Sequence, residues 1–308
     1  MSPASLPTDP LWPRAAHWIE PARGDDVGDL GLLGIPTHQT SITPTGAHMT
    51  PRAVRDALLR YSTYAASRAV DVATLRALDF GDVTNPDGPE GEERTRDAVA
   101  MASARCQLLV ALGGDNSLTY SAVRGLFGEP LDGCGLVTVD AHHDLRDGIS
   151  NGSPVRRLAE AGLPGANIVQ IGIADFSNSP AYAQRARELG ITVITRCELR
   201  GANPTLVVER AMDIAGAGGR PVFVDLDVDV CDRAEVPGCP SAAPGGITAD
   251  ELRELAYEFA RDPRVRGLDL TEIDATADTV DGRTVRLAAL LVLEAAAGLA
   301  KRLEATRM

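Results

Sequence analysis

Two short stretches of this chain place acidic and imidazole side chains at alternate positions. Residues 140–144 read Asp-Ala-His-His-Asp, and residues 225–229 read Asp-Leu-Asp-Val-Asp. Alternate side chains of an extended segment point the same way, so each stretch can direct three groups at one ion. Several carboxylates with a single imidazole form a hard, oxygen-rich donor set. Such a set suits manganese or magnesium better than structural zinc, and the imidazole favours manganese. Water bound to such an ion is a hydroxide near neutral pH, which is a nucleophile for hydrolysis.

These residues also have a structural explanation, because a single Asp-x-Asp pair often caps a turn and a lone histidine after a strand is often a core residue. Unpaired buried carboxylates, however, repel one another and destabilise a fold. The convergence of five or six such groups at strand ends is therefore better explained by metal binding. His143 alternates to the opposite side from His142 and is predicted to be structural.

Short apolar runs precede these residues and alternate with amphipathic segments. Near-continuous apolar runs are typical of strands that are buried on both faces of a parallel sheet. Strands are predicted at Leu30–Ile35, Gln107–Leu112, Gly135–Val139, Ile168–Ile173, Ile191–Ile194, Val222–Leu226 and Val265–Leu270. Helices are predicted at residues 50–61, 94–105, 117–127, 179–189, 250–260 and 285–303. The alternation predicts a parallel sheet with helices on both sides.

The predicted strands deliver the reactive groups to one edge of the sheet. Open parallel sheets bind ligands outside the carboxyl ends of their strands. Gly113–Asn116, the stretches 140–144 and 225–229, and Glu272 each lie at or directly after the end of a predicted strand. We therefore expect these four groups of residues to converge.

Local signals predict how some of the connecting segments fold. Thr50 before Pro51 is expected to be the N-cap of a helix. Thr248 and Glu251 are spaced as a capping box at the start of another helix. The acidic segment Asn85–Glu93 is expected to be a surface loop.

Composition narrows the class of protein. The chain has 308 residues, of which 44% are hydrophobic, and a net charge of −13, which argues against a nucleic-acid binder. No run approaches the roughly 20 apolar residues of a membrane span, and the first residues do not have the pattern of a secretory signal. The five cysteines form no Cys-x-x-Cys pair, which favours a reduced, cytoplasmic protein. Residues 1–28 are predicted to be an irregular lead-in, and residues 29–308 a single domain.

In their order along the chain, the motifs resemble the signatures of the ureohydrolase superfamily, which includes arginases, agmatinases and formimidoylglutamases. The resemblance rests on Gly113–Ser117, residues 140–144, Asp227–Asp232, Pro244–Gly246 and Glu272, and it extends over nearly the whole chain. It implies the arginase/deacetylase fold, a three-layer α/β/α unit whose parallel sheet has about eight strands. It also implies a binuclear manganese centre and attack by a metal-bound hydroxide on an amidine or guanidine carbon.

Further strings are similar to the formimidoylglutamase branch of this superfamily, at residues 48–55, 144–147, 150–156, 167–173 and 177–182. This resemblance implies hydrolysis of N-formimidoyl-L-glutamate to L-glutamate and formamide, a step of histidine degradation. A small-molecule substrate is therefore expected, with no nucleic-acid or membrane partner. Members commonly form trimers or hexamers, so a homo-oligomer is expected.

The resemblance also implies roles for individual residues. Asp140 and Asp227 would bridge the two ions. Glu272 would hydrogen-bond the amino groups of the amidine, and Asp144 and Glu272 are the expected catalytic residues. Asp225 matches no ligand of the family and is expected to be a supporting group. The implied metal ligands are Asn116, Asp140, His142, Asp144, Asp227 and Asp229.

One departure from the family pattern concerns the number of metal ions. Asn116 stands where the family has a histidine ligand, and an amide oxygen is a poorer donor than imidazole. Two manganese ions are expected, although Asp140, His142 and Asp229 resemble the single-metal site of deacetylases and could activate water with one. Asn116 could also be the N-cap of the helix at 117–127.

A second departure concerns the substrate. Asn151 stands where arginases have a histidine that shuttles protons, so an arginase proper is disfavoured and another group must transfer the proton. His48 is one candidate, with an ordinary surface residue as the alternative. Two other functions stay open. One is a guanidine hydrolase of the agmatinase or guanidinobutyrase type that releases urea, and the other is a metal-poor, non-catalytic paralogue.

The substrate carboxylates of an amidine acid require cationic or neutral donors. Arg146 and Arg156 are candidate clamps, because a guanidinium group matches a carboxylate with two parallel hydrogen bonds. Their alternative is a surface position or an ion pair with a nearby acid such as Glu160. Asn151 and Ser153 could add neutral hydrogen bonds to the substrate.

Overall fold

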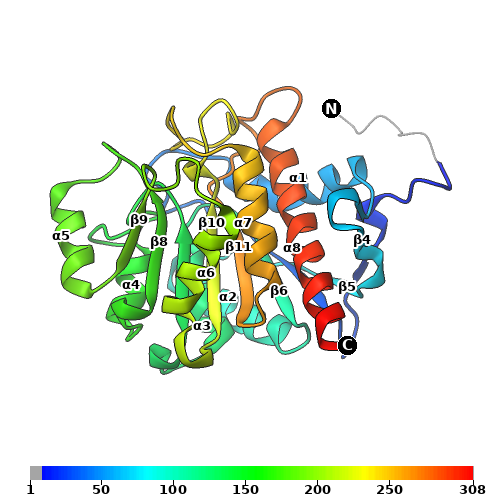
Figure 1. Ribbon diagram of the computed structural model, residues 1–308, viewed down its shortest axis with the longest axis horizontal. Helices are drawn as coiled ribbons and strands as arrows, with labels where there is room; N and C mark the ends of the chain where they lie inside the picture. The colour runs from blue at the N-terminus through cyan, green and yellow to red at the C-terminus, as the bar shows by residue number, and fades with distance from the viewer. Residues whose placement is uncertain (1–8, 308) are drawn as a thin grey trace.

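A parallel β-sheet of nine strands runs through the protein, in the order β1-β5-β2-β6-β11-β10-β7-β8-β9 (Figure 1). The computed structural model describes residues 9–307. Every pair of neighbouring strands in this sheet is parallel. The strands are β1 Ile19–Pro21, β2 Leu30–Ile35, β5 Ala77–Asp82, β6 Leu108–Gly113, β7 Gly135–Val139, β8 Ile168–Ile173, β9 Thr192–Thr195, β10 Val222–Asp227 and β11 Val265–Thr271. A separate antiparallel ribbon pairs β3, Tyr64–Ala65, with β4, Val70–Asp71.

Helices cover both faces of this sheet, which gives three layers (Figure 1). Alternate strand residues divide between the faces: Leu30 and Leu32 of β2 join one core cluster, whereas Leu33 and Ile35 join the other. The first cluster is completed by α1, α6, α7 and α8, and the second by α2, α3, α4 and α5. The helices are α1 Thr50–Ala57, α2 Gly88–Ser103, α3 Leu118–Phe127, α4 Pro154–Glu160, α5 Pro180–Leu189, α6 Pro204–Ala215, α7 Ala249–Arg261 and α8 Arg283–Arg307.

The predicted fold class, a three-layer α/β/α unit, is confirmed, and the sheet has nine strands where about eight were expected. Three strands, β2, β7 and β8, begin and end where the apolar runs predicted. The edge strand β1 comes from the expected lead-in, because Ile19–Pro21 pairs with Ala77–Asp79 of β5. Residues 1–8 of that lead-in lie outside the described residues. The boundary of a single domain at residue 29 stays a prediction.

Two local predictions were wrong and one was confirmed. Asn85–Glu93 is not a loop throughout, because α2 already begins at Gly88. Thr50 is the first residue of α1 rather than its N-cap, and its hydroxyl donates to the carbonyl of Ile273 at 2.5 Å. The capping box of α7 is present as predicted: the Thr248 hydroxyl accepts from the backbone N–H of Glu251, whose carboxylate accepts from the backbone N–H of Thr248.

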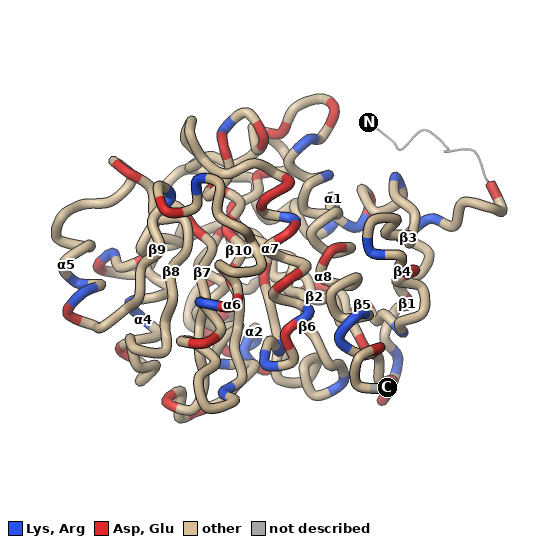
Figure 2. Tube along the Cα trace, in the orientation of Figure 1, with Lys and Arg blue, Asp and Glu red and all other residues tan. Residues whose placement is uncertain are grey.

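Charge is distributed over the whole described chain, with Lys and Arg scattered among Asp and Glu (Figure 2). This distribution is consistent with the acidic net charge of −13. Among residues 9–307, no helix is both long enough and apolar enough to span a bilayer.

Candidate metal centre

Four adjacent strands of the sheet, β6, β11, β10 and β7, end beside one another. Val139 of β7 is the register partner of Leu226 of β10, so the next residues, Asp140 and Asp227, leave the sheet side by side. Thr271 of β11 is in turn the partner of Asp227, and Glu272 follows it. The register therefore brings the predicted reactive groups to one edge, as the rule for parallel sheets requires.

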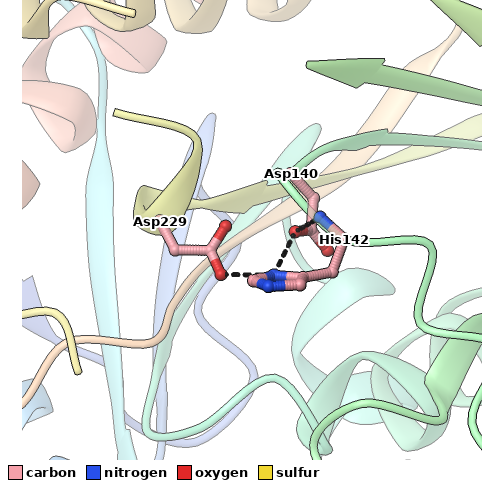
Figure 3. Close-up of side chains that lie close together, drawn as sticks. All are labelled: Asp140, His142 and Asp229. Carbon is pink, nitrogen blue, oxygen red and sulfur yellow. Dashed lines mark hydrogen bonds and ion pairs between the residues drawn. The ribbon is translucent and has the colours of Figure 1, made fainter. Parts of the chain in front are cut away.

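Asp140, His142 and Asp229 form a compact cluster at this edge (Figure 3). One ligand atom from each of the three lies within 4.8 Å of the others. His142 Nδ1 lies 2.7 Å from Asp229 Oδ2 and 3.5 Å from Asp140 Oδ1. Asp140 Oδ2 is buried and has no hydrogen-bond partner. A buried carboxylate oxygen without a partner next to two other potential ligands fits a site built for a cation.

Tight turns, rather than extended strands, produce this geometry. His142 lies beyond the end of β7, and its backbone N–H donates to Asp140 Oδ1 at 2.6 Å. Asp229 lies on a 3-10 turn, Val228–Val230, and its N–H donates to Asp227 Oδ1 at 2.8 Å. The expectation that alternation along a strand aligns these groups was therefore wrong. Asp140 and Asp227 instead each accept a hydrogen bond from the backbone two residues later, which turns the chain.

The charges of the cluster depend strongly on one another. Burial and the charge of Asp229 raise the pKa of Asp140 well above its usual range. Burial also raises the pKa of Asp227 and of Asp144, each beside another carboxylate. Burial alone would lower the pKa of His142, but the carboxylates of Asp229 and Asp140 raise it to about 12. The donor set is therefore short of positive charge, which a divalent cation would supply.

Asn116 and Asp144 lie together beside the cluster. Asp144 has a positive φ of 52°, and its Oδ2 accepts a hydrogen bond from Asn116 Nδ2 at 2.7 Å. In this orientation Asn116 presents an amide N–H, not its carbonyl, to Asp144. Thr119 Oγ1 lies 2.7 Å from Asn116 Oδ1 and 2.8 Å from Asp269 Oδ2, but a hydroxyl has one proton to donate. Thr119 can instead donate to Asp269 and accept from the amide nitrogen of Asn116, which requires the Asn116 amide to be reversed, with its oxygen and nitrogen exchanged. In that orientation the carbonyl oxygen of Asn116 faces Asp144.

The backbone before Asn116 approaches another loop closely. A Cβ atom at Gly114 would lie 1.9 Å from the carbonyl oxygen of Thr37, so only glycine fits at this position. The N–H of Asp115 donates to that same carbonyl at 2.9 Å. Gly114 therefore lets the chain after β6 pack against the loop after β2, which holds Asn116 in place.

Glu272 lies beside Asn116, in a strained backbone conformation with a φ of 62°. Its Oε1 accepts two hydrogen bonds, from the N–H of Asn116 at 2.8 Å and from Asn151 Nδ2 at 2.9 Å. Burial and the nearby charge of Asp115 raise the pKa of Glu272 to about 7. Asp225, by contrast, faces Asp269, Thr271 and Asn116 from within the sheet, and burial raises its pKa to about 7.

A pocket of about 270 Å³ opens above these groups. Seven predicted site residues line it: His142, Asp144, Arg146, Asn151, Asp227, Asp229 and Glu272. Ile42, Thr43, Ser177, Ser179, Tyr182 and Ser241 also line it and were not predicted. Residues 177–182 carried a signal, because that string contributed to the resemblance, whereas nothing in the sequence marks Ile42 or Thr43.

Two predicted substrate contacts do not reach this pocket. The Arg156 guanidinium donates to the carbonyls of Arg146, at 2.6 Å, and of Gly148, and pairs with Glu160 at 2.5 Å. Ser153 is fully buried, and its hydroxyl bonds with the backbone of Ser150. The prediction that they bind substrate was therefore wrong, because both side chains stabilise the loop that follows Asp144.

Two other histidines considered in the sequence, His48 and His143, are not among the residues that line the pocket. His48 is exposed and stacks on His38, with ring centroids 4.6 Å apart. His143 is buried, and its Nδ1 lies 2.7 Å from Gln170 Oε1, consistent with the structural role expected for it.

The sequence as a whole matches a known family over residues 28–298. The chain belongs to the arginase family. It is 33% identical over 290 residues to the formimidoylglutamase of Halalkalibacterium halodurans, covering 91% of this chain and 90% of that protein. The family match and the similarity to a formimidoylglutamase indicate that this protein is a hydrolase that acts on carbon–nitrogen bonds in linear amidines.

Solved structures of the arginase family share this architecture. The formimidoylglutamase of Bacillus subtilis superposes with a TM-score of 0.89 and 29% identity, covering 97% of this chain and 95% of that one. The formiminoglutamase of Trypanosoma cruzi with Mn2+ superposes with a TM-score of 0.86 and 25% identity, covering 94% and 99%. The resemblance read from the motifs is therefore confirmed at the level of family and fold.

Proposed function

We propose that the protein is a manganese-dependent formimidoylglutamase that hydrolyses N-formimidoyl-L-glutamate to L-glutamate and formamide. The observation that carries this proposal is the distribution of charge in the pocket. Its floor is formed by Asp144, Asp227, Asp229 and Glu272, and Arg146 is the one Arg or Lys in its lining. The amidine fits beside Glu272, the acid of this floor that is not a proposed metal ligand, and a carboxylate fits the arginine.

Manganese is proposed because of the donor set and because the Trypanosoma cruzi relative contains Mn2+. Asp140, His142 and Asp229 would hold one ion, with Asp227 beside them. A second ion would be held by Asp140, Asp227, Asp144 and the carbonyl oxygen of a reversed Asn116 amide. These six residues are the proposed ligands. When bound, the metal lowers the pKa of a water molecule and so supplies the nucleophile.

The protein's own residues would orient the amidine and move protons. Glu272 Oε1 is already occupied by two N–H donors, so Oε2 is the oxygen left to accept from the amidine nitrogens. Asp144 lines the same pocket and is placed to pass a proton from the attacking water to the leaving amine. Cleavage of the bond between the formimidoyl carbon and the glutamate nitrogen then releases glutamate and formamide.

Arg146 is positioned to bind a substrate carboxylate. Its guanidinium has no hydrogen bond or ion pair with any residue of the described chain, and the residue is exposed. Its side chain lies across Gly152, where a Cβ atom would be only 2.8 Å from Arg146 Cδ. The glycine therefore allows the arginine to lie over the loop with its donors free for an anion.

Replacing Arg146 with alanine should lower kcat/KM for formimidoylglutamate about 100-fold, mainly through KM, because a hydrogen-bonded charge pair is worth about 1.5–3 kcal/mol. Turnover of formamidine, which has the amidine but no carboxylate, should stay within about twofold. Arg146→Lys keeps the charge but lacks the planar guanidinium group. Its kcat/KM for formimidoylglutamate should lie between those of wild type and Arg146→Ala. Equal losses on both substrates would show that Arg146 acts on the fold rather than on the carboxylate.

A substrate panel with separate detection of formamide and urea tests the proposed function. The manganese-loaded protein should release formamide from formimidoylglutamate and little urea from agmatine or guanidinobutyrate. Urea as the main product from a guanidine would replace the proposal with the agmatinase-type alternative. The absence of bound metal after manganese loading, together with no turnover, would favour a non-catalytic paralogue. The trimer or hexamer and the cytoplasmic location remain predictions.

A further inference from the structure

Asn151 was expected to contact the substrate, but both halves of its side-chain amide are engaged by the protein. The backbone N–H of Ile42 donates to Asn151 Oδ1 at 3.1 Å. Asn151 Nδ2 donates to Glu272 Oε1 at 2.9 Å. A backbone N–H can only donate, so the amide oxygen must face Ile42 and the NH2 group must face Glu272.

These two hydrogen bonds join three segments that are distant in sequence. Ile42 lies in the loop after β2, Asn151 in the loop after β7, and Glu272 at the end of β11. The backbone N–H of Asn151 also donates to the carbonyl of Thr40, at 3.4 Å. All three residues line the pocket, so Asn151 connects one wall of the pocket to the carboxylate on its floor.

Glu272 needs such support because its backbone is strained and one oxygen must stay free. Its φ of 62° is uncommon for a residue with a side chain. Two N–H donors fix Oε1, one from the backbone of Asn116 and one from Asn151. With Oε1 held by both donors, Oε2 is the oxygen left for a ligand in the pocket that Glu272 lines. Without Asn151, the carboxylate of Glu272 could rotate about its one remaining hydrogen bond, from the N–H of Asn116.

We propose that Asn151 is a positioning residue, which holds Glu272 in the orientation that meets the amidine and fixes the Ile42 wall at the same time. The inference rests on the proposed function only in that Glu272 binds an amidine. The loop that carries Asn151 also carries Arg146, whose N–H donates to the carbonyl of Gly152 at 2.9 Å. Asn151 thereby also joins the loop of Arg146, which binds the substrate carboxylate, to Glu272, which binds the amidine.

A double-mutant cycle separates this role from direct substrate binding. Wild type, Asn151→Ala, Glu272→Ala and the double variant are compared with manganese and formimidoylglutamate. Asn151→Ala should lower kcat about 30-fold with KM within about threefold, because misplacement of a catalytic group costs up to about 100-fold. In the Glu272→Ala background, the same substitution should change kcat less than about twofold, because residues that act through each other are not additive.

A KM increase with kcat preserved, or additive losses in the double variant, would overturn the proposal and return Asn151 to substrate binding. Asn151→Asp guards against misfolding, because it is isosteric and keeps an acceptor for Ile42 but has no donor for Glu272. It should lose kcat as Asn151→Ala does, and wild-type turnover would also overturn the proposal. Manganese content should equal that of wild type in every Asn151 variant. Asn203→Asp, at the N-cap of α6, is the matched control with unchanged kcat.

The outcome is independent of which amidine proves to be the substrate. If the wild type releases urea from a guanidine instead, the proposed function fails, and the same cycle is run with that guanidine. Glu272 would meet the same type of nitrogen in either substrate. Non-additivity with the guanidine would support the role of Asn151 even though the proposed function had failed, and additive losses would overturn it.

Discussion

Replacing Asp227 with asparagine is expected to abolish turnover, with kcat reduced about 1,000-fold or more. The carboxylate lies beside the cluster of Asp140, His142 and Asp229, and one of its oxygens already accepts from the N–H of Asp229 at 2.8 Å. The amide can keep that hydrogen bond but contributes no negative charge to the proposed metal. A loss of about 4 kcal/mol in transition-state stabilisation corresponds to this reduction. Steady-state kinetics at saturating manganese, with metal analysis of the purified variant, measures the effect.

Asp225→Asn is the matched control, because Asp225 lies on the same strand and is equally buried. It faces Asp269 and Asn116 rather than the pocket, and burial raises its pKa to about 7. An uncharged amide is therefore compatible with its surroundings, and activity should stay within about tenfold of wild type. Retained turnover in Asp227→Asn, or an equal loss in both variants, would contradict the assignment of Asp227 to the metal.

Removal of the metal by a chelator should abolish turnover and lower the melting temperature, and added manganese should restore both. A ligand at 100 times its Kd stabilises the folded state by about 2.7 kcal/mol. For a chain of this size that corresponds to about 5 °C. Differential scanning calorimetry with and without manganese measures the shift.

The manganese-dependent shift should widen as the pH rises from about 5 to about 7.5. In the metal-free protein, burial raises the pKa of Asp140, Asp144 and Asp227, and raises that of Glu272 to about 7. A carboxyl whose pKa is higher in the folded than in the unfolded state holds more protons when folded. The metal-free protein therefore loses stability as the pH rises from about 4 through about 7. Metal binding needs the ionised carboxylates and so strengthens over the same range.

A melting temperature that is insensitive to chelation would contradict this account, as would a manganese shift that shrinks as the pH rises. Asp229 does not contribute to the loss of stability of the metal-free protein as the pH rises. Burial would raise its pKa, but the charge of His142 lowers it. Its contribution to stability is present above the ordinary carboxyl pKa of about 4 and is lost as the pH falls below it.

The central strands were predictable because their signal is local. Gly135–Val139 and Ile168–Ile173 are continuous apolar runs, as buried parallel strands require. Strand β5, Ala77–Asp82, was missed because it contains two aspartates and a glycine, and it lies near the edge of the sheet. The short β1 contains a proline and is recognisable only through its pairing with β5.

The convergence of the metal cluster was predictable from topology, whereas the partners of individual side chains were not. Asp140 directly follows β7 and Asp227 is the last residue of the adjacent parallel strand β10, so the sheet places them together regardless of loop structure. Arg156 and Asn151 both lie near the loop after Asp144, and the sequence does not show which group turns inward. The folded loop directs Arg156 to backbone carbonyls of the same loop, and it directs Asn151 to Glu272, which is distant in sequence.

The most direct test of the central claim is anomalous diffraction at the manganese edge from crystals of the manganese-loaded protein. We expect a peak within coordination distance of Asp140, His142, Asp227 and Asp229, at the carboxyl ends of β7 and β10. A second peak beside Asp144 and Asn116 would make the centre binuclear, whereas a single peak would leave the Asn116 side without metal. The absence of any peak at the Asp140–His142–Asp229 cluster, in crystals whose protein is active, would contradict the account.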